Sequence, residues 1–166
     1  MRILLIESGV VRRLPLVERI LKNKLAEAHI ENVEVESATV SEQVLGQTDR
    51  QMADTVDEAD MAAHSSIRLL TRKLLNSADL VLVMAREQRD FLTKFVDYNR
   101  WNCLHVFQHY CFGRDEDLTE PACERENDLL YRQIMESVEE GCRKIVQKVS
   151  EILDVSSSKV QQLALE

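Results

Sequence analysis

Short apolar runs alternate with amphipathic segments along the whole chain. Residues 3–6 are continuously apolar, as in a strand buried on both faces, and from Pro15 to about His29 the apolar positions have helical spacing. Pro15 fits the first turn of that helix, where its missing N–H would have no partner. Strands that alternate with helices predict an α/β fold with a parallel sheet covered on both faces.

The later segments repeat this pattern. We expect three more strands, at 32–38, 80–84 and 103–107, which give a four-stranded sheet. The further helices expected are a weak acidic one near 49–63, a short one before residue 80, one at about 87–98, and a long closing helix. The apolar stripe of the closing helix runs from Leu130 to Ile152, and "DVSSSK" is expected to interrupt it. No linker divides the chain, so we expect one domain over residues 1–153 and a tail over 154–166.

Net charge, the length of the apolar runs and the spacing of cysteines and histidines limit which partners, location and ligands we expect. The 166 residues carry a formal net charge of −8, so nucleic acid and anionic lipid are poor partners. The apolar runs are too short to span a membrane, and no signal peptide is apparent, so we expect a cytoplasmic protein. The four cysteines have no metal-binding spacing. His105 and His109 are four residues apart, but His105 lies in an expected strand, so they do not form a helical metal-binding pair, and His64 has no histidine at that spacing. We therefore expect free thiols, no metal and no cofactor.

The first turn is the expected position of a ligand site. In parallel α/β sheets, ligands bind outside the carboxyl ends of the strands, and the turn after residues 3–6 leads into a helix N-terminus that favours anions. We therefore expect a phosphate- or sulfate-type anion as the candidate ligand. The residues of this loop are Glu7, Ser8, Gly9, Val10, Val11, Arg12, Arg13 and Leu14.

The same loop carries a family resemblance. "ESGVVRRLP" resembles the active-site loop of the low-molecular-weight protein tyrosine phosphatases, which is a Cys, five residues, Arg, Ser and Pro. The segments "VESA", "LLTRKLLNSADLVLVMAREQ", "DLTEP" and "LLYRQIMESVEEGCRKIV" are similar to later parts of that family, in the same order, to about residue 150. The resemblance implies a three-layer, doubly wound, four-stranded parallel sheet.

The resemblance also implies roles that this chain fills imperfectly. The family's cysteine nucleophile corresponds to Glu7, its loop asparagine to Val10, and its loop serine to Leu14. The general acid of its Asp-Pro pair corresponds to Glu120, which either donates a proton or is an ordinary surface carboxylate. Gly9, Arg13 and Pro15 match the motif, and Ser8 is a conservative substitute for Thr. The segment "TVSEQVLGQ" also lacks the aromatic residue that grips phosphotyrosine in the family.

Three interpretations of Glu7 are open. Its carboxylate could imitate bound phosphate among the loop N–H groups, with Arg13 as its partner. The loop could instead have lost its shape, with Glu7 turned to solvent and Arg13 recruited elsewhere. Glu7 could also act as a nucleophile or base, which carboxylates do in other folds. Like charges about 4 Å apart repel by roughly 4 kcal/mol at an effective dielectric constant near 20, which favours the first interpretation.

Two functional hypotheses result. The first is a catalytically impaired phosphatase relative that acts through protein contacts, with the C-terminal helix as a surface for a second copy or another partner. The alternative is an active phosphatase-type hydrolase or a phosphate sensor that uses Arg13 and Glu120.

Overall fold

The computed structural model describes residues 1–8, 14–40, 67–118 and 128–163. Only the backbone is described for residues 8, 67, 128–131 and 155–163. The expected acidic helix near 49–63 and most of the phosphate loop therefore lie outside the described residues.

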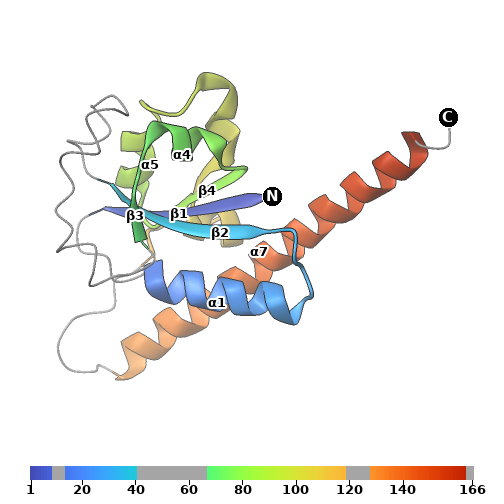
Figure 1. Ribbon diagram of the computed structural model, residues 1–166. Coiled ribbons are helices and arrows are strands. Elements are labelled where there is room, and N and C mark those ends of the chain that lie inside the picture. Colours follow the sequence, from blue (N-terminus) through green and yellow to red (C-terminus); the bar gives the residue numbers. More distant parts are fainter. Residues whose placement is uncertain (9–13, 41–66, 119–127, 164–166) are drawn as a thin grey trace.

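A five-stranded parallel sheet forms the centre of the molecule (Figure 1). Its strands are β1 (Arg2–Ser8), β2 (Glu34–Val40), β3 (Ile67–Leu69), β4 (Leu80–Val83) and β5 (Leu104–Val106). The spatial order β3-β2-β1-β4-β5 reverses direction at β1, as in doubly wound folds. The expected four-stranded sheet was wrong by one strand, because three-residue β3 is too short to show any periodicity.

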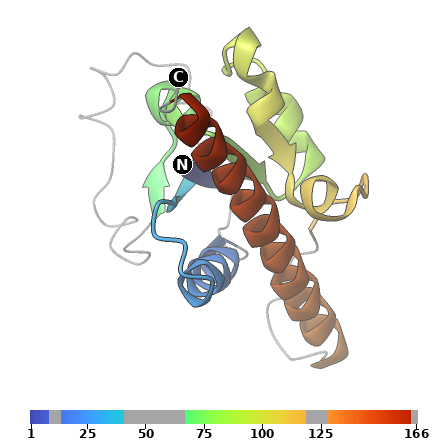
Figure 2. The same cartoon turned by 90° about the vertical axis from the view of Figure 1, so that its right-hand side faces the viewer.

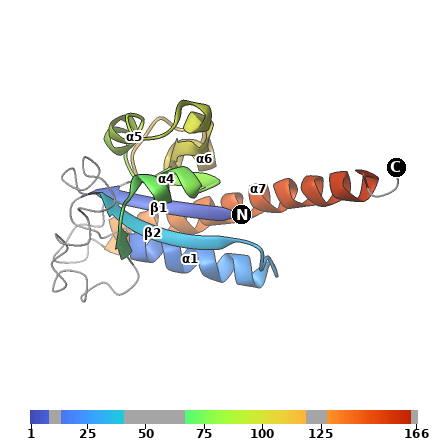
Figure 3. The same ribbon diagram turned by 45° about the horizontal axis from the view of Figure 1, so that its top comes forward.

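Helices cover both faces, so the expected three layers are confirmed. On one face lie α1 (Leu14–Glu27) and α7 (Asp128–Leu163), and on the other lie α4 (Arg72–Ser77) and α5 (Arg86–Leu92) (Figure 3). Side chains of β1 alternate between two apolar clusters: Ile3 and Leu5 face α1 and α7, whereas Leu4 and Ile6 face α4 and α5. No described helix has both the length and the apolar character to cross a membrane.

Several element boundaries differ from the expectation. Helix α5 ends at Leu92 rather than near Tyr98, because the Asn76 side chain binds the backbone that would continue the helix. Its Nδ2 donates a hydrogen bond to Phe95 O, and its Oδ1 accepts one from Asp97 N. A short 3₁₀ helix, η1 (Tyr98–Cys103), then leads into β5. Phe107 does not belong to a strand but begins α6 (Phe107–Phe112), which ends at Gly113 in the left-handed conformation.

The closing helix is longer than expected. Helix α7 continues through "DVSSSK" to Leu163 and leaves the body of the molecule at its C-terminal end (Figure 1). Ile134, Val138, Ile145 and Val149 are buried as expected, but Ile152 is 48% exposed because the helix has passed the core by that turn. The expected interruption at "DVSSSK" was therefore wrong, and the domain boundary after residue 153 stays a prediction.

Candidate functional site

Glu7 lies at the carboxyl end of β1, at the point where the strand order reverses. Residues 3–6 of β1 pair with β4, whereas Glu7 pairs only with Thr39 of β2. Because side chains alternate along a strand, Glu7 follows Ile3 and Leu5 and points to the face covered by α1. The fold thus directs this carboxylate under the first helix.

The Glu7 carboxylate binds the N-terminus of α1. Glu7 is 0% exposed, and its Oε2 accepts a hydrogen bond from Leu14 N at 3.3 Å. Leu14 is the first residue of α1 and is also fully buried. The N–H groups at a helix start have no intrahelical partners and attract anions, so the carboxylate takes a position suited to a phosphate oxygen.

This geometry bears on the three interpretations of Glu7. The second was wrong in turning the side chain to solvent, because Glu7 is fully buried, whereas the loss of the loop's shape concerns residues that lie outside the described ranges. The expected pairing of Glu7 with Arg13 stays a prediction, since residues 9–13 lie outside the described residues. The same holds for the roles of Ser8, Gly9, Val10, Val11 and Arg12.

The turn after β4 lies at the same carboxyl edge of the sheet as Glu7. Gln88 is buried, and its Oε1 accepts hydrogen bonds from Met84 N at 2.9 Å and Ala85 N at 3.1 Å. A Gln at the third position of a helix often caps the preceding turn, so "MAREQ" itself carries a sequence signal for this cap.

The segment that precedes Glu120 is hydrogen-bonded to the turn after β4. Asp117 Oδ1 accepts hydrogen bonds from the backbone N of Arg86 at 2.9 Å and from its Nε at 3.2 Å. The hydrogen bond with Asp117 raises the pKa of the Arg86 guanidinium above its ordinary value. Leu118 N then donates to Met84 O at 2.9 Å, and Leu118 is buried. The chain is thus held at the carboxyl edge up to residue 118, although Glu120 itself is outside the described residues.

The cysteines and histidines that the structure describes lie away from Glu7 and the candidate site. Cys111 and Cys142 are buried between helices, and burial raises the pKa of each thiol to about 12. Burial lowers the pKa of His105, which contacts Tyr110 in the β5–α6 region. Among the residues that the structure describes, no group of His, Cys, Asp and Glu side chains could hold a metal ion.

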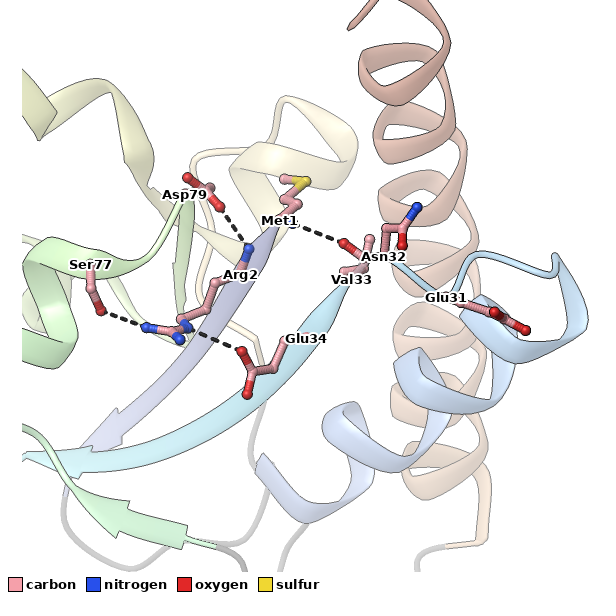
Figure 4. A pocket seen from close by; sticks show the side chains of 8 residues that line it. All are labelled: Met1, Arg2, Glu31, Asn32, Val33, Glu34, Ser77 and Asp79. Atoms are coloured by element: carbon pink, nitrogen blue, oxygen red, sulfur yellow. Dashed lines mark hydrogen bonds and ion pairs between the residues drawn. The ribbon is translucent and has the colours of Figure 1, made fainter. Parts of the chain in front are cut away.

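An open polar pocket of about 630 Å³ lies at the opposite, amino edge of the sheet (Figure 4). Its polar groups satisfy one another: Arg2 donates to Glu34 and Ser77, and Asp79 Oδ2 accepts from Arg2 N at 2.7 Å. This pocket is separated from Glu7 by the length of β1 and is not part of the candidate site.

Comparisons with known proteins agree with this architecture. A family model for low molecular weight phosphotyrosine protein phosphatases matches residues 2–155. No curated protein matches the chain.

Three solved structures illustrate the likeness. A low molecular weight protein tyrosine phosphatase from Bacillus subtilis is 24% identical, with 91% of this chain and 98% of that chain covered and a TM-score of 0.66. A protein tyrosine phosphatase from Entamoeba histolytica is 16% identical, with coverage of 91% and 96% and a TM-score of 0.67. An arginine phosphatase from Geobacillus stearothermophilus is 22% identical, with coverage of 92% and 96% and a TM-score of 0.63. At these identities, the structural likeness establishes the fold.

Proposed function

Because the chain belongs to the low molecular weight phosphotyrosine protein phosphatase family, we propose that it is a catalytically impaired member whose phosphate loop is plugged by Glu7. It acts through protein contacts rather than by hydrolysis. The observation that carries this proposal is the buried hydrogen bond between the Glu7 carboxylate and Leu14 N.

Electrostatics support a plug rather than a phosphate receptor. A bound phosphate would have to approach a carboxylate that already uses the N-terminus of α1. Like charges about 4 Å apart repel by roughly 4 kcal/mol at an effective dielectric constant near 20, which weakens binding about a thousandfold. The carboxylate also fills space that the phosphate oxygens would need.

One observation favours the alternative function. The chain up to Leu118 is held at the carboxyl edge by Asp117 and by the bond from Leu118 N to Met84 O, two residues before Glu120. An active phosphatase-type hydrolase or phosphate sensor would use this tether to present Glu120, with Arg13 as the anion clamp. Both residues lie outside the described part of the chain, so we retain this function as the second candidate.

Turnover of an aryl phosphate separates the two candidates. We expect no hydrolysis by the wild type above that of a Glu7→Ala variant. Turnover by the wild type that is lost in Glu7→Ala would establish the active hydrolase and exclude the plug.

A Glu7→Cys variant shows what remains of the machinery. The solved neighbours include phosphatases of phosphotyrosine and of phosphoarginine, so both classes of substrate belong in the assay. Recovered activity would mean that the loop keeps its shape and lacks only its nucleophile. Millimolar phosphate should raise the melting temperature of Glu7→Cys but not of the wild type, and a shift in the wild type would support the phosphate sensor.

The cytoplasmic location stays a prediction.

A further inference from the structure

Glu18 and Ser37 carry buried polar atoms in the layer between α1 and the sheet. Glu18 is 6% exposed and Ser37 is 1% exposed. Glu18 Oε1 accepts a hydrogen bond from Lys22 Nζ, but Glu18 Oε2 and Ser37 Oγ have no hydrogen-bond partner within the part of the chain that the structure describes. A buried polar atom that makes no hydrogen bond destabilises a fold, so two such atoms in one layer point to a shared partner.

The register of the sheet turns Ser37 toward α1. Ser37 of β2 pairs with Leu5 of β1, and residues paired in this way point to the same face of a sheet. Leu5 packs in the apolar cluster that α1 and α7 cover, and so does Val35, two residues before Ser37 on β2. The Ser37 hydroxyl therefore lies under α1.

Glu18 reaches the same level of the sheet as Ser37. The hydrogen bond from Leu14 N to Glu7 places the start of α1 over the end of β1. From Leu14 to Glu18 the helix rises roughly 6 Å, and from Glu7 back to Leu5 the strand spans roughly 6.6 Å. A helix that connects two parallel strands runs antiparallel to them, so Glu18 lies level with the Leu5–Ser37 pair.

Glu18 also lies on the side of α1 that is away from α7. Helix α7 packs along the other flank of α1 (Figure 2), where Cys142 Sγ donates a hydrogen bond to Val17 O and the charge of Lys24 acts on the Cys142 thiol. At 3.6 residues per turn, Glu18 is about 120° from Lys24 around the helix. The Glu18 side chain is therefore directed toward β2.

We propose that a buried water molecule bridges Glu18 Oε2 and Ser37 Oγ and so joins α1 to β2. A neutral ligand is favoured over a cation because the Lys22 ammonium already balances the Glu18 carboxylate, and the Ser37 hydroxyl carries no charge. Water can donate one hydrogen to the carboxylate and share a second hydrogen bond with the hydroxyl, which gives it the polar partners that a buried site requires. The bridge lies one turn beyond the bond between Leu14 N and Glu7, and it does not depend on the proposed function.

A crystal structure of the wild type, at a resolution that shows ordered water, tests the bridge directly. We expect a water within hydrogen-bond distance of both Glu18 Oε2 and Ser37 Oγ. A direct hydrogen bond between the two side chains would overturn the proposal. So would a gap without density, or a water that contacts only one of them.

The stability of Ser37→Ala gives an independent test in solution. If the hydroxyl holds a water that also binds Glu18, its removal should lower the folding equilibrium constant about three- to tenfold in urea unfolding. If Ser37 Oγ is unpaired, the substitution removes an unsatisfied buried group instead. A Ser37→Ala variant as stable as the wild type, or more stable, would therefore overturn the proposal.

A double-mutant cycle shows whether the two side chains share one partner. Ser37→Ala should cost less in a Glu18→Met background, because the water has already lost its other anchor there. Arg19→Met, at the exposed next position of α1, is the matched control, and Ser37→Ala should cost as much in that background as in the wild type. An equal cost in the Glu18→Met background would mean that Ser37 and Glu18 are not bridged.

Discussion

The backbone N–H of Leu14 donates a hydrogen bond to Glu7 Oε2 across 3.3 Å, between two residues that are fully buried. The Glu7 carboxylate thereby joins the first residue of α1 to the C-terminal end of β1. A charged acceptor stabilises a helix N-terminus through both the hydrogen bond and the helix dipole. The candidate site therefore has a structural role in this chain that does not require turnover.

Removing this acceptor should destabilise the fold. We expect Glu7→Ala to lower the free energy of unfolding by about 1–3 kcal/mol, because Leu14 N is left buried and unsatisfied. Glu7→Gln should lower it less, since an amide oxygen can still accept the bond. Urea unfolding measures both, with Glu27→Ala in the exposed last turn of α1 as the control. A Glu7→Ala variant as stable as the wild type would show that the carboxylate does not support α1.

Much of this site was predictable from the chain. The apolar run 3–6 located β1, the pattern of strands and helices gave a parallel sheet covered on both faces, and the family resemblance gave its doubly wound order, which the structure has. The alternation of Ile3 and Leu5 with Leu4 and Ile6 also implies that Glu7 points toward α1. The sequence alone did not give this direction, because residues 3–6 are apolar at every position and show no alternation.

The differences between expectation and structure come from contacts distant in sequence. Helix α5 ends early because Asn76, in α4, binds the backbone at Phe95 and Asp97. The short β3 exists because Ser37, Ala38 and Thr39 of β2 provide a ladder for it. No local window contains such information, since each case depends on a partner that the fold brings from elsewhere.

Gly141 should be intolerant of any side chain. A Cβ at this position would lie 2.5 Å from Phe107 Cζ, so the fully buried Phe107 ring would have to shift within the packed core. We expect Gly141→Ala to lower the free energy of unfolding by about 1–3 kcal/mol, although alanine favours helices. A second change, Phe107→Leu, should reduce the effect of Gly141→Ala in a double-mutant cycle. Purely additive effects would mean that the ring is not the obstacle.

Asp117 should hold the segment beside the candidate site. We expect Asp117→Ala to speed hydrogen exchange at the amides of Arg86 and Leu118, because the variant loses the acceptor of Arg86 N. Glu116→Ala, its exposed neighbour, should leave both amides protected. Equal protection in both variants would show that Leu118 and Met84 hold the segment without Asp117.

The buried thiols should make the folded chain less stable in alkali. Burial raises the pKa of Cys111 and Cys142 from 9.0 to about 12, so the folded state keeps both protons where the unfolded state begins to lose them. The resulting stability is fully present below pH 9 and is lost as the pH rises toward 12, by at most about 1.4 kcal/mol per pH unit for each thiol. Half-buried Tyr110, whose pKa burial also raises, acts in the same direction.

Two measurements on the thiols check this expectation. Because Cys111 and Cys142 are buried and their raised pKa keeps them protonated at pH 8, iodoacetamide should label Cys103 well before either of them in the folded chain. Unfolding free energies from pH 8 to 10.5 should fall less steeply in a Cys111→Ala, Cys142→Ala double variant, because the contribution of the two buried thiols is removed while that of Tyr110 stays. Cys103→Ser should follow the wild-type slope. If the unfolding free energy of the double variant falls with pH as steeply as that of the wild type, the two thiols titrate alike in the folded and unfolded states. The loss of stability in alkali would then come from other groups.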